Sequence, residues 1–165
     1  MTVTIERESD IPLPFSEQEV AEAVISETLD YEDCPYEVQV NIILTTDEEI
    51  HKINLEQRNV DAPTDVLSFP MIEYAYPADF TVLESDSMDN FDPDTGELIL
   101  GDIVISVDKV IEQAEKYNHG VKREYAFLIA HSMLHLFGYD HMDELERETM
   151  ENRQEEILQR LNITR

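Results

Sequence analysis

Three histidines lie within eleven residues, at His131, His135 and His141, although the chain has only five. His131 and His135 are four residues apart, so a helix would place them on the same face. Gly138 can end that helix in a left-handed conformation, and the reversed chain can then bring His141 back toward the other two. Three imidazoles with no fourth protein ligand are typical of a catalytic zinc, whereas a structural zinc has four protein ligands. We therefore predict one Zn²⁺ per chain, bound by these three histidines; the alternative is a buried helix with incidental histidines.

The residue after the first histidine separates two kinds of zinc hydrolase. Zinc peptidases with a His-Glu-x-x-His motif carry their general base there, but this chain has Ser132, which is not a base at neutral pH. The spacing otherwise matches the extended metzincin pattern. Hydrolysis of a phosphodiester needs less help from a base when a cation stabilises the developing negative charge. Arg58 is the candidate for this catalytic cation, because its planar guanidinium matches phosphate geometry, although its position alone would favour a surface arginine.

The elements that must position these residues can be read from the hydrophobic pattern. Residues 121–137 are apolar nearly all round, which predicts a buried helix carrying the histidines beside the core. Capping residues predict four further helices, beginning after Ser16, Thr46, Ser106 and Asp143. Alternating or continuous apolar runs predict strands at 2–8, 37–44, 66–69 and 98–106. We expect an α/β (layered α+β) fold, with a small mixed sheet of about four strands, about five helices and a metal cleft at the end of the buried helix.

The length and composition predict a single domain over residues 1–165, with an acidic surface excursion at about 71–96. That segment has seven acidic residues and no basic one. The single Cys34 excludes an intrachain disulfide and a cluster of thiolate zinc ligands. The sequence shows no signal peptide and no apolar run of membrane-spanning length. We expect a cytoplasmic protein without a membrane partner.

The net charge of −27 argues against sequence-independent binding of nucleic acid, which relies on Lys and Arg. The basic residues are not evenly spread, however. Four of the eleven precede the histidine helix closely: Lys109, Lys116, Lys122 and Arg123. We predict that some of them form a positive rim near the metal together with Arg58. The negative charge should then lie on residues 71–96 and on the outer face of the C-terminal helix.

The chain resembles the YbeY family of single-domain endoribonucleases, the ribosomal RNA maturation factors. The resemblance covers nearly the whole chain and depends on four motifs together. These are Asn54 to Arg58, Thr64-Asp-Val-Leu-Ser-Phe-Pro70, Leu100-Gly-Asp-Ile103 and His131-x-x-x-His135-Leu-x-Gly138-Tyr-Asp-His141. It implies a small α/β fold with a metal cleft, zinc on His131, His135 and His141, and a functional arginine at Arg58.

The same resemblance implies a zinc-dependent, single-strand-specific endoribonuclease that acts in maturation of small-subunit ribosomal RNA and in ribosome quality control. The expected partners are ribosomal RNA precursor and the small ribosomal subunit with its proteins, and no DNA. Two alternatives stay open at this point. One is a non-catalytic ribosome-assembly factor with a structural zinc, whose acidic surface contacts basic ribosomal proteins. The other is a metzincin-like metalloprotease, which Ser132 disfavours.

Three further polar residues lie near or outside the motif, at Asp140, His51 and His119. Asp140 could accept a hydrogen bond from a ligand imidazole, or it could be an exposed turn aspartate. His51 and His119 have no partner at a recognisable spacing, so we expect ordinary surface residues.

Overall fold

The computed structural model describes residues 1–83 and 88–163. Its one sheet has the strand order β1-β2-β4-β3. The strands are β1 (Thr2–Arg7), β2 (Val38–Thr45), β3 (Val66–Pro70) and β4 (Leu98–Ser106). β1, β2 and β4 run parallel, whereas β3 lies antiparallel to β4 at the edge, the place where Pro70 was expected to be tolerated. The predicted fold class, a small mixed sheet with helices, is confirmed.

Five α-helices complete the described fold, each close to its predicted position. They are α1 (Glu17–Tyr31), α2 (Asp47–Arg58), α3 (Val107–Lys116), α4 (Val121–Leu136) and α5 (Glu144–Arg160), with 3₁₀ turns η1 (Phe80–Leu83) and η2 (Met88–Asn90). The four predicted caps each accept a backbone N–H of the first helical turn: Ser16, Thr46, Ser106 and Asp143. None of the helices among the described residues has the length and apolar character of a membrane-spanning segment.

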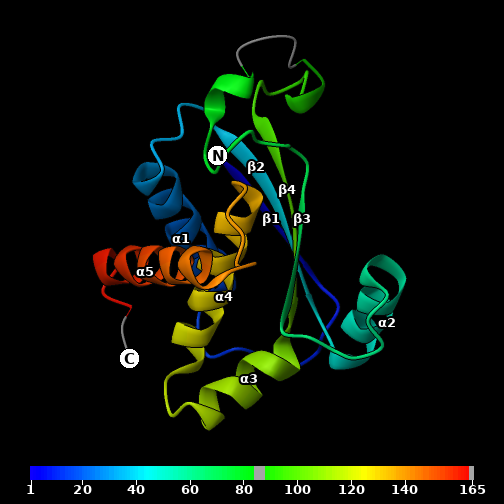
Figure 1. Cartoon of the computed structure of the whole chain (residues 1–165). Helices are drawn as coiled ribbons and strands as arrows, with labels where there is room; N and C mark the ends of the chain where they lie inside the picture. Colours follow the sequence, from blue (N-terminus) through cyan, green and yellow to red (C-terminus); the bar gives the residue numbers. More distant parts are fainter. Residues whose placement is uncertain (84–87, 164–165) are drawn as a thin grey trace.

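The helices lie in two unequal layers around the sheet (Figure 1). α1 and α4 cover one face, with α5 packed against both of them, and α2 covers the other face. The main core lies between the sheet and α4, whose Tyr125, Ile129 and Met133 are fully buried. A smaller cluster around Ile50 and Val104 holds α2 against the opposite face. Removal of this apolar surface from water fixes α4 in the middle of the molecule, and its histidines with it.

A β-bulge in β4 adjusts the sheet to this core. The pairing with β2 shifts by one residue beside Leu100. The shift lets residues on both sides of it face the main core: Leu98 and Leu100 before it and Ile103 after it. Strict alternation along the strand would not allow this. Gly101, with φ +152°, follows the extra residue. A Cβ there would lie 2.4 Å from the carbonyl oxygen of Phe69, so the close approach of β3 requires glycine.

The predicted acidic excursion, residues 71–96, contributes more to the core than its composition indicated. Residues 84–87 of it lie outside the described part of the chain. Leu83 is buried in the main core, and the ring of Phe80 packs edge to face against Phe137 with centroids 5.5 Å apart. The segment therefore also covers the C-terminal end of α4, beside the histidines.

Candidate metal centre

The chain reversal after α4 follows from Gly138, as the sequence predicted. This residue has φ +96°, a conformation that favours glycine. Its N–H donates to the carbonyl oxygen of His135 at 3.0 Å, and the N–H of Tyr139 donates to that of Leu134 at 3.0 Å. These two bonds form a Schellman motif, which ends the helix and turns the chain back. The reversal returns His141 to the face of α4 that carries His131 and His135.

The three histidines form a compact group at this reversal. Their potential ligand atoms all lie within 4.8 Å of one another. The Nε2 atoms of His131 and His135 are 3.1 Å apart, and the His141 ring lies 5.0 Å from that of His135, centroid to centroid. No other His, Cys, Asp or Glu of residues 1–83 and 88–163 joins this group. The arrangement can therefore hold one metal ion with a coordination position left for water or substrate, the pattern of a catalytic site.

Hydrogen bonds on the far side of two rings orient them toward a common point. Nδ1 of His135 lies 2.9 Å from the carbonyl oxygen of Tyr139, to which it can only donate. The side-chain amide nitrogen of Gln154, which is buried, lies 2.8 Å from Nδ1 of His131. A metal on Nε2 requires the proton on Nδ1, so the Gln154 amide must present its oxygen to His131 when metal is bound. The His135 contact suits an imidazole that binds metal through Nε2 as it stands, and the His131 contact does so once the Gln154 amide is turned.

Burial keeps the two helical histidines in the protonation state that binds metal. It lowers the pKa of His131 to about 4, with smaller contributions from His135 and His141. Burial likewise lowers the pKa of His135, against the hydrogen bond to Tyr139. A neutral imidazole offers a lone pair, whereas an imidazolium does not. Both residues are therefore ready to coordinate a cation at neutral pH.

The histidines open into a cleft of about 840 Å³ between α4 and the edge strand β3. Arg58 lines this cleft from the end of α2, so the structure brings the predicted arginine and the three histidines together. Arg58 makes no ion pair with a carboxylate in the described part of the chain. Its charge is therefore available to an anionic group beside the histidines.

Ser132 does not face this cleft. It is fully buried, and its hydroxyl shares a hydrogen bond of 2.6 Å with Ser68 on β3. The position where zinc peptidases carry their general base is thus used to fasten α4 to the sheet. Asp65 does line the cleft, next to β3, and its carboxylate accepts from the N–H of Val66 at 2.7 Å.

Asp140 behaves as a turn residue. It is exposed, and its carboxylate accepts from the backbone N–H of His141 at 2.8 Å. The acceptor for a ligand imidazole is the carbonyl oxygen of Tyr139 instead, one residue earlier. Of the two interpretations of Asp140, the structure supports the exposed turn, which also holds the chain that carries His141.

The predicted positive rim does not form as expected. Lys109 pairs with Asp47 at 3.2 Å, and Arg123 is buried in an ion pair with Glu155. Neither lines the cleft, and the same is true of Lys116 and Lys122. The prediction was wrong because Lys109 and Lys116 belong to α3, and Lys122 and Arg123 to the first turn of α4. The histidines lie at the other end of α4, in its last turns and just after it. Of the predicted rim, only Arg58 reaches the cleft.

The surface assignment of His119 was also wrong. Its side chain is 5% exposed and lies 2.6 Å from the buried carboxylate of Glu124. A chain reversal after α3 buries it, which no spacing in the sequence could reveal. His51 is partly exposed, as predicted, and lies 2.7 Å from Asp61.

Two residues at the site, Asp65 and Gln154, have no role that was predicted from the sequence. The signal for Gln154 was present, because it shares the inward face of α5 with Met150 and Ile157. A polar residue at an apolar position of a helix indicates a buried hydrogen bond. Asp65 precedes a buried strand in a recognised motif, but only the tertiary fold shows which cavity it lines.

Comparisons with known proteins agree with this architecture. A family model described as "Endoribonuclease YbeY" matches residues 3–162. Relatives named Endoribonuclease YbeY from Lachnoclostridium phytofermentans and Agathobacter rectalis are each 56% identical over 165 residues, the full length of both chains. One of the same name from Clostridium botulinum is 43% identical over 87% of each chain. The solution structure of TM1509 from Thermotoga maritima matches with a TM-score of 0.55 at 23% identity, over 98% of this chain and 92% of that one, a likeness of fold.

Proposed function

The chain belongs to the YbeY family, and we propose that it is a zinc-dependent, single-strand-specific endoribonuclease. The observation that carries the proposal is the three-histidine group at a cleft that also contains the unpaired Arg58. A metal with an open position beside a free guanidinium suits hydrolysis of a phosphodiester. The absence of a base at Ser132 weakens the metalloprotease alternative.

Each group in the cleft has a separate task in this reaction. When bound, zinc supplies Lewis-acid chemistry and lowers the pKa of a coordinated water to about 7. His131, His135 and His141 hold it, and their outer hydrogen bonds keep the Nε2 atoms directed at it. Arg58 contacts the phosphate oxygens through its planar fork and stabilises the negative charge that develops on them.

We propose that the substrate is the ribosomal RNA precursor of the small subunit. The enzyme would then act in ribosome maturation and quality control, in the cytoplasm. The names of the relatives support an RNA substrate. The net charge of −27 disfavours a duplex, whose dense phosphates would be repelled. A single strand can reach the cleft through a few local contacts. The small ribosomal subunit and its proteins are the partners that this role requires.

The test is cleavage of a single-stranded fragment of ribosomal RNA precursor by zinc-loaded protein. His135→Ala, purified in parallel, is the control for contaminating nuclease. We expect about one zinc per chain and cleavage in the wild-type protein, and loss of both in the variant because two imidazoles leave the ion largely hydrated. Duplex RNA and a DNA strand of the same sequence should stay intact. Absence of a transition metal after zinc loading, or cleavage that survives in His135→Ala, would contradict the proposal.

The non-catalytic alternative makes a different prediction for the same preparation. A structural zinc has four protein ligands, whereas the described part of the chain supplies three. The extreme acidity nonetheless suits contact with basic ribosomal proteins. If zinc-loaded protein binds small subunits but never cleaves RNA, the assembly-factor alternative replaces the endoribonuclease.

A further inference from the structure

Two smaller cavities extend the metal cleft toward the loop after α3. The first, of about 270 Å³, includes His131 and His141 in its wall. The second, of about 230 Å³, lies farther along and is lined by Asp65, Gln113, Tyr117, His119, Arg123, Glu124 and Phe127. Asp65 lines the cleft and both cavities, and Phe127 lines both cavities. The three spaces are therefore neighbours along one path, which begins at the metal group.

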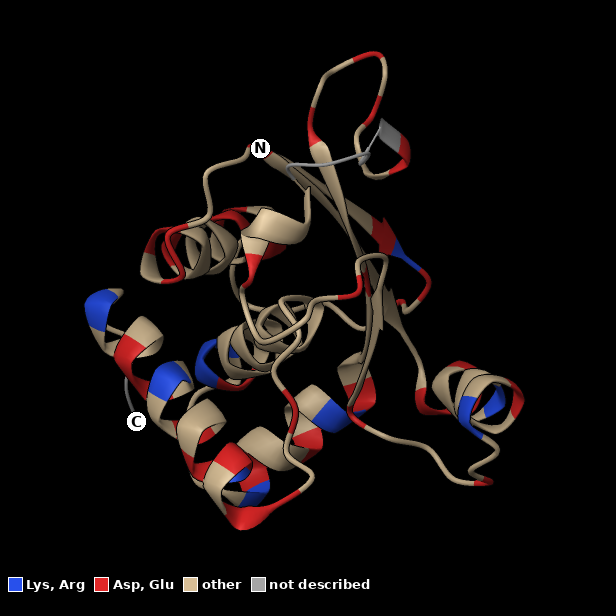
Figure 2. Ribbon diagram, turned by 45° about the horizontal axis from the view of Figure 1, so that its top comes forward, with Lys and Arg blue, Asp and Glu red and all other residues tan. Residues whose placement is uncertain are grey.

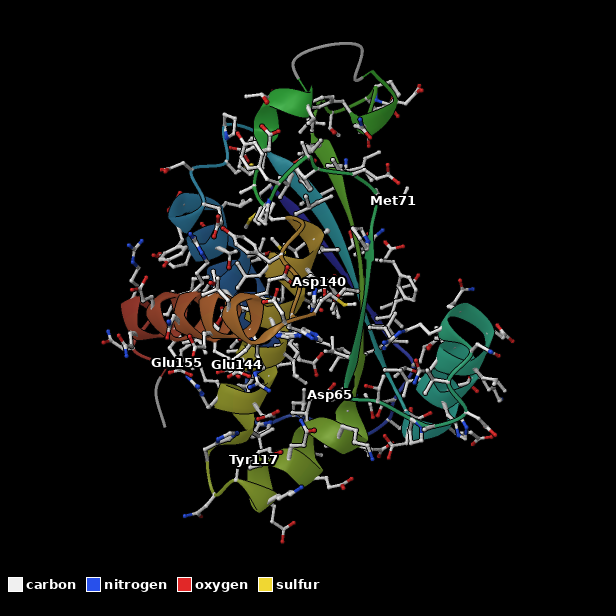
Figure 3. The ribbon with its side chains drawn as sticks, in the orientation of Figure 1. Asp65, Met71, Tyr117, Asp140, Glu144 and Glu155 are labelled. Atoms are coloured by element: carbon white, nitrogen blue, oxygen red, sulfur yellow. The ribbon has the colours of Figure 1, made fainter. Side chains whose placement is uncertain are left out.

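We call the second cavity, lined by these seven residues, the Tyr117 pocket. Two of its walls are aromatic rings. Tyr117 is 51% exposed. Figure 3 shows Tyr117 at the end of α3, with Asp65 at the base of β3. Phe127 forms a second wall, and its ring is also stacked with that of His131, 6.5 Å away. Exposed aromatic rings beside hydrogen-bonding groups are typical of sites that take unpaired bases.

The inner side of the pocket is a fixed polar network. The amide nitrogen of Gln113 donates to Glu124 at 2.6 Å and to Asp65 at 3.3 Å. Glu124 is held in turn by His119. These contacts leave carboxylate and amide groups along the wall at defined positions. They also tie the loop that carries Tyr117 to α4, so the ring is presented on a rigid support.

The distribution of unpaired cations follows the same path. In the described part of the chain, Arg58, Lys116 and Lys122 have no ion pair with a carboxylate. Arg58 lines the cleft, while Lys116 has its ammonium 5.5 Å from the centre of the Tyr117 ring. Lys122 follows the same loop in the first turn of α4. One free cation, Arg58, thus lies in the cleft and another, Lys116, lies beside the ring of the Tyr117 pocket, where a strand could place phosphates.

We propose that the Tyr117 pocket binds one base of a single-stranded RNA whose backbone passes the metal group. The proposal rests on the endoribonuclease function above and names a subsite for it. The base stacks on Tyr117, its polar edge meets Gln113 and Asp65, and Lys116 contacts the adjoining phosphate. A volume of about 230 Å³ is below the range typical of drug-sized ligands and suits one base, not a base pair. The pocket would therefore favour single strands.

The test is a set of short single-stranded RNAs of one sequence, each lacking the base at one position. They are compared in the zinc-loaded wild-type protein, Tyr117→Ala, Tyr117→Phe and Tyr76→Ala. Tyr76 is the matched control, because it is 63% exposed and lines a different cavity. In wild type, loss of the base at one position should lower kcat/KM about tenfold, the size of one stacked base. Tyr117→Ala should cleave intact RNA with a kcat/KM about tenfold lower than wild type. Removal of the base at that position should then cause no further loss in this variant.

A binding measurement separates failure of this proposal from failure of the function. 2-Aminopurine placed at each position should be quenched at one of them by wild type, Tyr76→Ala and Tyr117→Phe, but not by Tyr117→Ala. If wild type cleaves RNA but Tyr117→Ala responds to every missing base as wild type does, the pocket is overturned and the function stands. If wild type does not cleave, the function fails. Binding to the uncleaved strands then tests the pocket alone. The pocket is supported if wild type quenches 2-aminopurine at one position and Tyr117→Ala does not. It is refuted if Tyr117→Ala quenches as wild type does, or if wild type quenches at no position.

Discussion

Arg58 is the residue whose charge the cleft leaves free, so its replacement should affect chemistry more than structure. We expect Arg58→Ala to keep its zinc content and melting temperature but to cleave RNA about 10²-fold more slowly, the usual effect of removing one donor to a developing oxyanion. Arg58→Lys should recover little, because an ammonium cannot reproduce the guanidinium fork. Single-turnover cleavage with metal analysis of the same samples measures both effects.

Arg160 provides the matched control for this comparison. It is the basic residue in the last turn of α5, as Arg58 is in the last turn of α2, and its side chain is 53% exposed. Arg160→Ala should cleave RNA at the wild-type rate. Equal rates for Arg58→Ala and the wild type would remove Arg58 from the site, whatever its place in the cleft.

Gln154 should determine how tightly the metal is held, although it is not a ligand. Gln154→Met keeps a similar shape but removes the amide whose oxygen would accept from Nδ1 of His131 when metal is bound. We expect zinc affinity to fall about 10- to 100-fold, as for other partners of metal-bound histidines. Gln154→Glu restores an acceptor and should bind zinc at least as tightly as the wild type. Competition with a chromophoric chelator measures the affinities; a Met variant that binds zinc normally would show that Gln154 only fills space.

Only some of the site residues could be predicted from the sequence. The histidines and Arg58 were identified because their chemistry is visible in residue type and spacing. Gln154 and His119 were not, because their roles depend on partners far along the chain: α5 brings Gln154 to His131, and a turn buries His119 against Glu124. The fate of a polar side chain depends on burial, which local spacing does not report.

Most helices and strands could be predicted from the sequence, but the β-bulge in β4 could not. Caps at Ser16 and Thr46 and the apolar stretch of α4 are local signals, and the structure has these elements where they were expected. The bulge beside Leu100 was not predictable, because it arises from the pairing of β4 with β2. Because β4 is apolar almost throughout, its sequence does not show that the residues after the bulge point to the opposite face from the one that alternation would give.

Gly101 should therefore be the glycine least tolerant of a side chain. An added Cβ meets the carbonyl oxygen of Phe69 at 2.4 Å and a methyl of Leu136 at 2.9 Å, and φ is already in the glycine region. We expect Gly101→Ala to lower the free energy of unfolding by at least about 2 kcal/mol, through overpacking and backbone strain together. Urea unfolding measures the change.

Gly96 separates the two causes. It also has positive φ, +76°, but a Cβ there meets nothing within 4 Å. Gly96→Ala should therefore lower the free energy of unfolding by only about 1 kcal/mol, from conformation alone. If the two variants were equally stable, the close approach of β3 to β4 would have no energetic consequence.

The charge of the whole molecule sets the conditions under which it can meet RNA. Figure 2 shows acidic residues on every side of the ribbon and basic residues at a few places, most of them on helices. Most of the described basic residues are neutralised by carboxylates, in pairs involving Arg7, Lys52, Lys109, Arg123, Arg147, Arg153 and Arg160. The attraction for RNA must then come from the few that remain, within a repulsive surround.

This balance predicts an unusual dependence of RNA affinity on salt. Three free cations, Arg58, Lys116 and Lys122, can release only a few counterions from a single strand, which limits the slope of log K against log salt to about −2. Screening of the general repulsion acts in the opposite direction, since the Debye length falls from about 30 Å at 0.01 M to about 10 Å at 0.1 M. With a net charge of −27, we expect screening to prevail, so affinity should rise or stay flat over that range. Fluorescence anisotropy of a labelled single-stranded RNA with the zinc-loaded protein measures it. A steep monotonic fall, as for an ordinary basic RNA-binding protein, would show that attraction through many phosphate contacts outweighs the repulsion argued from the fold.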